Sequence, residues 1–238
     1  MQNSRVLTLK KSVKVFSQML FWVPVAGFSL LLVYNTLPYF SFSKEFSFIV
    51  ERSFLFQSKF YTTCFYLHIA AGSICIIGAL ILFSRYILKK SKPIHRITGK
   101  IYVSVVLFLG APTGLYMAFF AKGTYWERVL FMFMAAWWFI TTYKGLMKIH
   151  QRNVLAHKIW MLRSYSMAMT AVTFRVYHIM FYLIGWGHLE NYEISLWISV
   201  IGNMLFAEWI IFRESKYYLK AIQIIFKKKT SLQNSFQS

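Results

Sequence analysis

The chain has 238 residues, of which 58% are hydrophobic, 20% aromatic and only 14% charged. Soluble domains carry about 25% charged residues, so this composition excludes an ordinary soluble domain and indicates a membrane protein. The two cysteines, Cys64 and Cys75, fall in one apolar segment, which excludes a disulfide framework.

Six apolar runs follow one another, each near or above the roughly 20 residues that a spanning helix needs. They cover about 16–40, 60–84, 99–121, 129–147, 159–185 and 193–212. The first run is too long for a signal peptide and lacks a small-residue cleavage site, so we expect it to be retained. The sequence therefore predicts an all-α integral membrane bundle, with a basic amino terminus at 1–15, one six-helix domain at 16–212 and a basic tail at 213–238.

The basic residues indicate the orientation of this bundle. The amino terminus, the 85–100 loop, the 144–158 loop and the 213–229 stretch carry four, six, four and six Lys and Arg, whereas the other three loops share five. By the positive-inside rule, both termini are expected to be cytoplasmic. The net charge of +20 then reflects topology and attraction to anionic lipid, and nucleic acid is excluded as a partner.

Two further segments have the composition of helices on the membrane surface. Residues 41–57 place phenylalanines on one helical face at the outer side, and residues 214–229 mix Tyr, Ile and Lys at the inner side. We interpret both as anchors for the flanking helices.

The fifth run is the most polar, because residues 157–178 carry His157, Arg163, Arg175 and His178. At 100° per residue, His157 and Arg175 point the same way. An ionisable group inside a membrane costs several kcal/mol unless it faces protein or water. The sequence therefore predicts a bundle with a polar interior.

Two other helices contribute histidines. Cys64, His68, Gly72 and Cys75 share one face of the second helix; helix packing explains the small residues, whereas a lone imidazole needs a partner. On the third helix, His95 is either an interfacial histidine or a ligand. Pro112 is expected to kink that helix.

The sixth helix carries Glu208, the only carboxylate expected inside the membrane, since Glu193 stands at the outer end of the same run. An ion pair with Arg163, at similar depth, would be structural or would handle protons. His157 and His178 lie about 30 Å apart along their helix, so they cannot share a metal. The polar groups thus form two levels: a cytoplasmic one with His95, His150, His157, Arg163 and Glu208, and an outer one with His68, Arg175 and His178.

Four segments resemble a family of bacterial membrane proteins of no assigned function, the domain-of-unknown-function family DUF2306. They are HIAAGSICIIGALILF, HRITGKIYV, HKIWMLRSYSMAMTAVTFR and NMLFAEW, spread over roughly 68–209. The resemblance implies a bacterial cytoplasmic (inner) membrane protein. The family pattern maps onto His68, His95, Arg96, Gly99, His157, Trp160, Arg163, Ser164, Arg175, Asn203 and Glu208; His150 and His178 lie outside it.

More loosely, the chain resembles the six-helix b-type cytochromes that carry electrons from ascorbate to ferric iron. In those proteins four histidines on the central helices hold two haems, one near each face. Here no helix carries the paired histidines; the inner pair is His95 with His157, and an outer pair needs His68 with His178. This pattern fits two bound haems poorly. It is compatible with one haem, and also with a protein that binds no haem.

Three functions remain open, and with them whether the protein is an enzyme. As a membrane oxidoreductase, it would use His95 and His157 as ligands of haem b iron. His68 and Arg175 would then hold a second haem, a quinone head group or a substrate anion, and Arg96 or Arg163 the haem propionates. The partners would be the lipid bilayer and a quinone or redox protein.

As a transporter, the protein would line a proton or anion path with Glu208, His157 and Arg175, although inverted repeats are absent. As a non-catalytic membrane subunit, it would use the same charges only to hold helices together. No HExxH, GxSxG or CxxC motif supports hydrolase chemistry.

Overall fold

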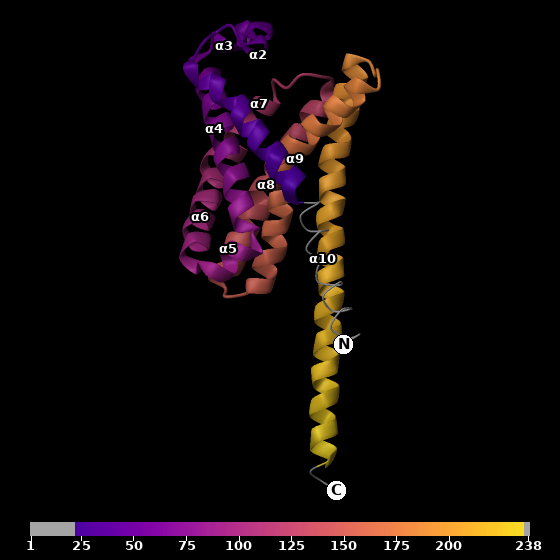
Figure 1. Ribbon diagram of the computed structural model, residues 1–238. Helices are drawn as coiled ribbons and strands as arrows, with labels where there is room; N and C mark the ends of the chain where they lie inside the picture. Colours follow the sequence, from indigo (N-terminus) through magenta and orange to yellow (C-terminus); the bar gives the residue numbers. More distant parts are fainter. Residues whose placement is uncertain (1–21, 236–238) are drawn as a thin grey trace, which may run out of the picture.

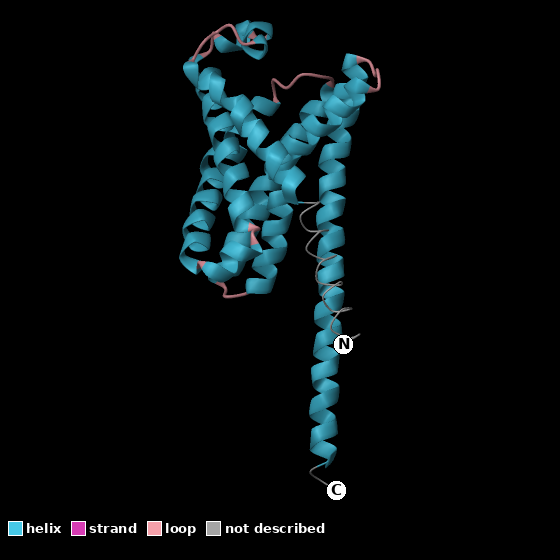
Figure 2. Cartoon of the chain, in the orientation of Figure 1, coloured by secondary structure: helices cyan, strands magenta, loops and turns pink. Residues whose placement is uncertain are grey.

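The computed structural model describes the backbone of residues 22–235 and the side chains of 22–215 except Arg85, His188 and Leu189 (Figures 1 and 2). The expected basic amino terminus at 1–15 and the start of the first apolar run lie outside the described residues. Within 22–235 every regular element is helical, as the composition predicted.

The elements run in chain order from a helix at 22–36 to a very long carboxy-terminal helix. They continue with η1 (Leu37–Ser41), α2 (Ser47–Glu51), α3 (Ser53–Phe56), α4 (Lys59–Leu82), α5 (Arg85–Lys90), α6 (Lys92–Val105), the π-helix η2 (Val106–Gly110), α7 (Ala111–Ala118), α8 (Tyr125–His150), α9 (Val154–Leu183) and α10 (His188–Ser235).

Five segments of the described chain are long and apolar enough to cross a membrane: Trp22–Ser41, Lys59–Leu82, Lys92–Ala118, Tyr125–His150 and Glu190–Ser215. They confirm five of the predicted spans, with ends shifted by several residues. The predicted span at 159–185 corresponds to α9, which has 30 residues and is about 45 Å long at 1.5 Å per residue. α9 is not apolar enough to count as a candidate membrane span, because it contains Arg163, Arg175 and several hydroxyl groups.

Three boundaries differ from the sequence prediction. The 85–100 loop is largely helical, because Pro93 stands in the first turn of α6, where its missing N–H costs nothing. Residues 41–57 form two short helices that meet at Arg52. The 213–238 tail begins as a continuation of α10, which extends beyond the ends of the other helices (Figure 1).

Helix packing divides the bundle into two connected halves. α4 packs against α6, η2 and α7, and α9 packs along both α8 and α10. One buried cluster, centred on Cys75, Ala79, Tyr102 and Val106, lies in the first half. A second cluster, formed by Leu130, Leu196 and Val200, joins α8 to α10.

The third span changes helix type where it carries Pro112. Proline cannot donate a backbone hydrogen bond, and the π-helix η2 immediately precedes it. The expected irregularity at Pro112 therefore includes a turn of wider helix at Val106–Gly110. Such turns are frequent at functional sites. This one ends at Gly110, whose carbonyl oxygen is hydrogen-bonded to His68.

Candidate functional site

His157 on α9 is held by a glycine carbonyl of α8. Its Nδ1 lies 2.8 Å from the carbonyl oxygen of Gly145. A carbonyl can only accept, so Nδ1 carries the proton and the Nε2 lone pair of the neutral ring stays available. A Cβ at Gly145 would lie only 2.6 Å from Met161 Sδ, so glycine permits the close approach of the two helices.

His95 on α6 lies near His157. Its Nδ1 is buried and has no hydrogen-bond partner among the described residues, and its ring is within electrostatic range of the His157 ring. α6 and α9 make no extensive backbone contact, so the two imidazoles come from helices that are not packed directly against each other. A buried, unpartnered imidazole nitrogen of this kind requires an explanation.

His68 on α4 repeats the arrangement of His157 at another depth. Its Nδ1 lies 3.1 Å from the carbonyl oxygen of Gly110, the last residue of η2, and 3.3 Å from Thr113 Oγ1. A Cβ at Gly114 would lie 2.8 Å from His68 Cε1, so the ring fits against bare backbone. The His68 imidazole was expected to need a partner, and the third span supplies it through Gly110 and Thr113.

A buried network of hydroxyl groups lies between the two histidine–glycine contacts. Tyr102 Oη is 2.9 Å from Ser164 Oγ, and Thr142 Oγ1 is 2.7 Å from the same atom. Trp138 Nε1 donates to Tyr102 Oη at 3.2 Å. Thr142 precedes Gly145 by one helical turn, and the ring of Trp138 lies against Gly110. The network thus joins α6, α8 and α9 at the centre of the bundle.

Sequence analysis named Ser164 through the family pattern but missed Tyr102, Thr142 and Trp138. These residue types are common in membrane helices, and their spacing does not say which helices are neighbours. The capping box of α8 was also missed. Its signal is present, because Thr124 and Glu127 have the required spacing, and the structure shows both reciprocal hydrogen bonds.

Arg163 and Glu208 form the ion pair that was expected between α9 and α10. Arg163 Nε lies 2.6 Å from Glu208 Oε1, and the second guanidinium nitrogen lies 2.9 Å from Oε2. The same guanidinium lies over the ring of Trp160 at 4.5 Å. This two-point geometry is typical of strong arginine–carboxylate pairs. Its consequence is that Arg163 already has an anionic partner within the chain.

Among the described residues, the two remaining candidate arginines, Arg175 and Arg96, make no hydrogen bond with a histidine. Arg175 donates to the carbonyl oxygen of Ala171 in its own helix at 2.8 Å and makes no contact with His68. The expected outer site of His68 with Arg175 around a haem, a quinone head group or an anion stays a prediction. Arg96 is exposed near the start of α6, one residue after His95.

The described residues contain no group of three or more His, Cys, Asp or Glu side chains that could hold a metal ion. The inner level instead offers two imidazoles, His95 and His157. Cys64 and Cys75 are buried free thiols on α4. Two nitrogen donors are too few for a structural zinc site, which usually has four ligands.

These features define a helical, multi-pass membrane protein with histidines fixed at two depths. The chain belongs to the family of predicted membrane proteins DUF2306, whose model matches residues 65–211. The match includes each candidate histidine and arginine discussed above and Glu208. Neither a curated protein nor a solved structure matches the chain. The similarity to b-type cytochromes therefore rests on the sequence pattern alone.

Proposed function

We propose that this protein is a membrane redox protein that binds one b-type haem between His95 and His157. The supporting observation is the buried, unpartnered Nδ1 of the half-buried His95, within electrostatic range of a His157 ring whose own Nδ1 is already bonded to Gly145. Ligating histidines commonly donate their second ring N–H to a backbone carbonyl, which fixes the tautomer and makes the other nitrogen more basic.

The residues present suit a haem better than a bare ion. A six-coordinate haem takes two axial ligands from the protein, and histidines on two helices without extensive backbone contact can supply them. The haem, when bound, would supply a one-electron redox couple. Arg96 is the better candidate for the propionates, since the Arg163 guanidinium is occupied by Glu208.

We further propose one haem and no second one at the outer level. The His68 ring is packed against Gly114 and bonded to Gly110, and Arg175 makes no hydrogen bond with it. His68 then serves to hold α4 against the third span. Electrons would be exchanged with a quinone in the bilayer or with a redox protein.

The same proposal includes α9 as a sixth span, with both termini cytoplasmic, in the bacterial inner membrane. α9 packs along α8 and α10, both of which qualify as spans, and the four basic segments would then lie on one side. The polar groups of α9 are directed to partners within the bundle, which reduces the cost of placing this helix in lipid.

Visible spectra of the full chain in mild detergent, oxidised and dithionite-reduced, test the proposal. We expect a Soret band that shifts on reduction and sharp α and β bands. His95→Ala and His157→Ala should each remove the six-coordinate spectrum, whereas His150→Ala should not, because His150 is exposed at the end of α8.

Folded protein with a flat spectrum after haem supplementation would overturn the haem proposal. An unchanged spectrum in His95→Ala would overturn the ligand assignment.

Proton transport is the alternative that a specific observation favours. The hydroxyl groups of Tyr102, Ser164 and Thr142 are hydrogen-bonded in series, and such series can pass protons. Proton uptake into liposomes that carry the haem-free protein, lost in Glu208→Gln, would support transport over redox chemistry.

A further inference from the structure

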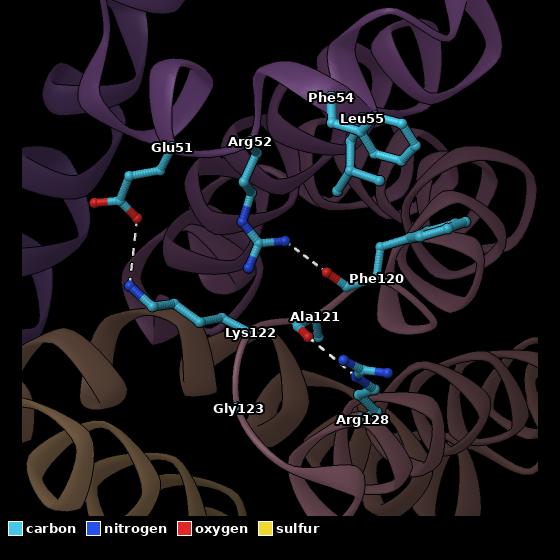
Figure 3. A pocket seen from close by; sticks show the side chains of 9 residues that line it. All are labelled: Glu51, Arg52, Phe54, Leu55, Phe120, Ala121, Lys122, Gly123 and Arg128. Carbon is cyan, nitrogen blue, oxygen red and sulfur yellow. Dashed lines mark hydrogen bonds and ion pairs between the residues drawn. The ribbon is translucent and has the colours of Figure 1, made fainter.

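A pocket of about 390 Å³ lies at the end of the bundle formed by α2, α3 and the α7–α8 connection (Figure 3). Arg52 enters it from the α2–α3 corner, and Lys122 and Arg128 enter it from the α7–α8 connection and the start of α8. One carboxylate, that of Glu51, shares the pocket. The lining therefore has a net charge of +2.

The two guanidinium groups are held in place by the backbone. Arg52 donates to the carbonyl oxygen of Phe120 at 2.5 Å, and Arg128 Nε donates to that of Ala121 at 3.3 Å. The two acceptors are consecutive residues, so both arginines are anchored to one short stretch of chain. Each guanidinium has five N–H donors and uses only part of them in these bonds. The Arg52 guanidinium also lies over the ring of Phe48, at 5.1 Å from its centroid, so the N–H groups at its edge can still bond an anion in the pocket.

The position of these cations is not explained by membrane topology. The three loops at this end of the chain share only five Lys and Arg, as expected for the side opposite the basic loops. Three of the five line this one pocket. Like charges at close range repel, and Glu51 offsets only one of them, through an ion pair with Lys122 at 3.3 Å. An anionic ligand would compensate the remaining two.

The pocket also has an apolar wall. Phe54 and Phe120 line it, and Phe54 is 79% exposed. In a membrane protein, a cationic pocket beside exposed aromatic rings at the end of a bundle faces the layer of phosphates and glycerol esters. The ligand with the matching chemistry has an anionic phosphate next to an apolar chain.

We propose that this pocket binds the phosphate group of an anionic phospholipid. Arg52 and Arg128 contact the phosphate oxygens, Lys122 adds a third positive charge, and the aromatic rings of Phe54 and Phe120 contact the acyl ester region. Glu51 opposes binding, because its carboxylate competes with the phosphate for Lys122. This site is separate from the histidines, and it does not depend on the redox proposal.

Lipid retention and thermal unfolding of the full chain in detergent test this site. Phosphatidylglycerol should raise the unfolding midpoint and remain bound in native mass spectra, whereas phosphatidylcholine should do neither. Lys122→Gln and Arg128→Gln should each weaken phosphatidylglycerol binding about tenfold, the loss expected for one hydrogen bond to a charged group. Lys59→Gln is the matched control, because Lys59 is an exposed cation at the same end but outside the pocket.

Glu51→Gln should instead raise the affinity for phosphatidylglycerol several-fold, because it removes the carboxylate that competes for Lys122. A variant with a damaged fold could not bind the lipid more tightly. Inorganic phosphate that displaces phosphatidylglycerol at millimolar concentration would support a phosphate site that also takes free phosphate. The proposal is overturned if the two lipids stabilise the protein equally. It is also overturned if Lys59→Gln weakens binding as much as the pocket variants do.

Discussion

The Nδ1 atom of His157 and the carbonyl oxygen of Gly145 lie 2.8 Å apart, and this contact fixes one helix face against the next. His68 makes the equivalent contact with Gly110 in the other half of the bundle. In both cases a glycine lets an imidazole reach the backbone of a neighbouring helix. The two contacts give the bundle fixed histidines at two depths, and the first prediction below tests the glycine on which one of them depends.

Replacement of Gly145 should separate α8 from α9. In Gly145→Ala the new methyl group would meet Met161 Sδ at 2.6 Å, so we expect a loss of about 1–3 kcal/mol in unfolding free energy. The shift in the midpoint of thermal unfolding in detergent measures this loss. Gly202→Ala is the matched control on α10, because nothing lies within 4 Å of its added Cβ. Equal midpoints for the two variants would contradict the packing argument.

Removal of the Tyr102 hydroxyl should weaken the central network. Tyr102→Phe deprives Trp138 Nε1 of its acceptor and Ser164 of one partner, at a cost of about 1–2 kcal/mol. Tyr143→Phe, on the exposed face of α8, should leave the unfolding midpoint unchanged. If both variants behave alike, the network contributes little to stability.

Loss of Glu208 should leave the Arg163 charge without its carboxylate. We expect Glu208→Gln to destabilise the protein by about 2–3 kcal/mol, because the mostly buried Arg163 guanidinium would be left without its carboxylate. The double variant Arg163→Met with Glu208→Leu should recover most of this loss. A double variant that is less stable than Glu208→Gln would show that the pair itself is strongly favourable.

The capping box should stabilise the start of α8. Thr124→Ala removes the side chain that satisfies the first turn and contacts Glu127, which is only 2% exposed. The expected cost is about 1 kcal/mol. Thr63→Ala, at an exposed position on α4, serves as the reference. Hydrogen exchange confined to the first turn of α8 would report the same effect locally.

The sequence predicted those features that depend on one helix at a time. Apolar run length located five spans, and the cost of two charges at similar depth predicted the Arg163–Glu208 pair. The apolar run began only at about residue 99, whereas α6 starts at Lys92. Hydropathy does not detect the first turns of this helix, because they are polar and contain Pro93.

The sequence also could not place Tyr102 beside Ser164 or bring Arg52 to the α7–α8 connection. Those contacts depend on which helices are neighbours, and spacing along one chain does not encode this.

α10 continues without a break past the end of the candidate span that it contains. The candidate span ends at Ser215, and the helix continues to Ser235. Twenty further residues advance about 30 Å, which equals the thickness of the hydrocarbon core itself. A helix that keeps its direction therefore acts as a strut.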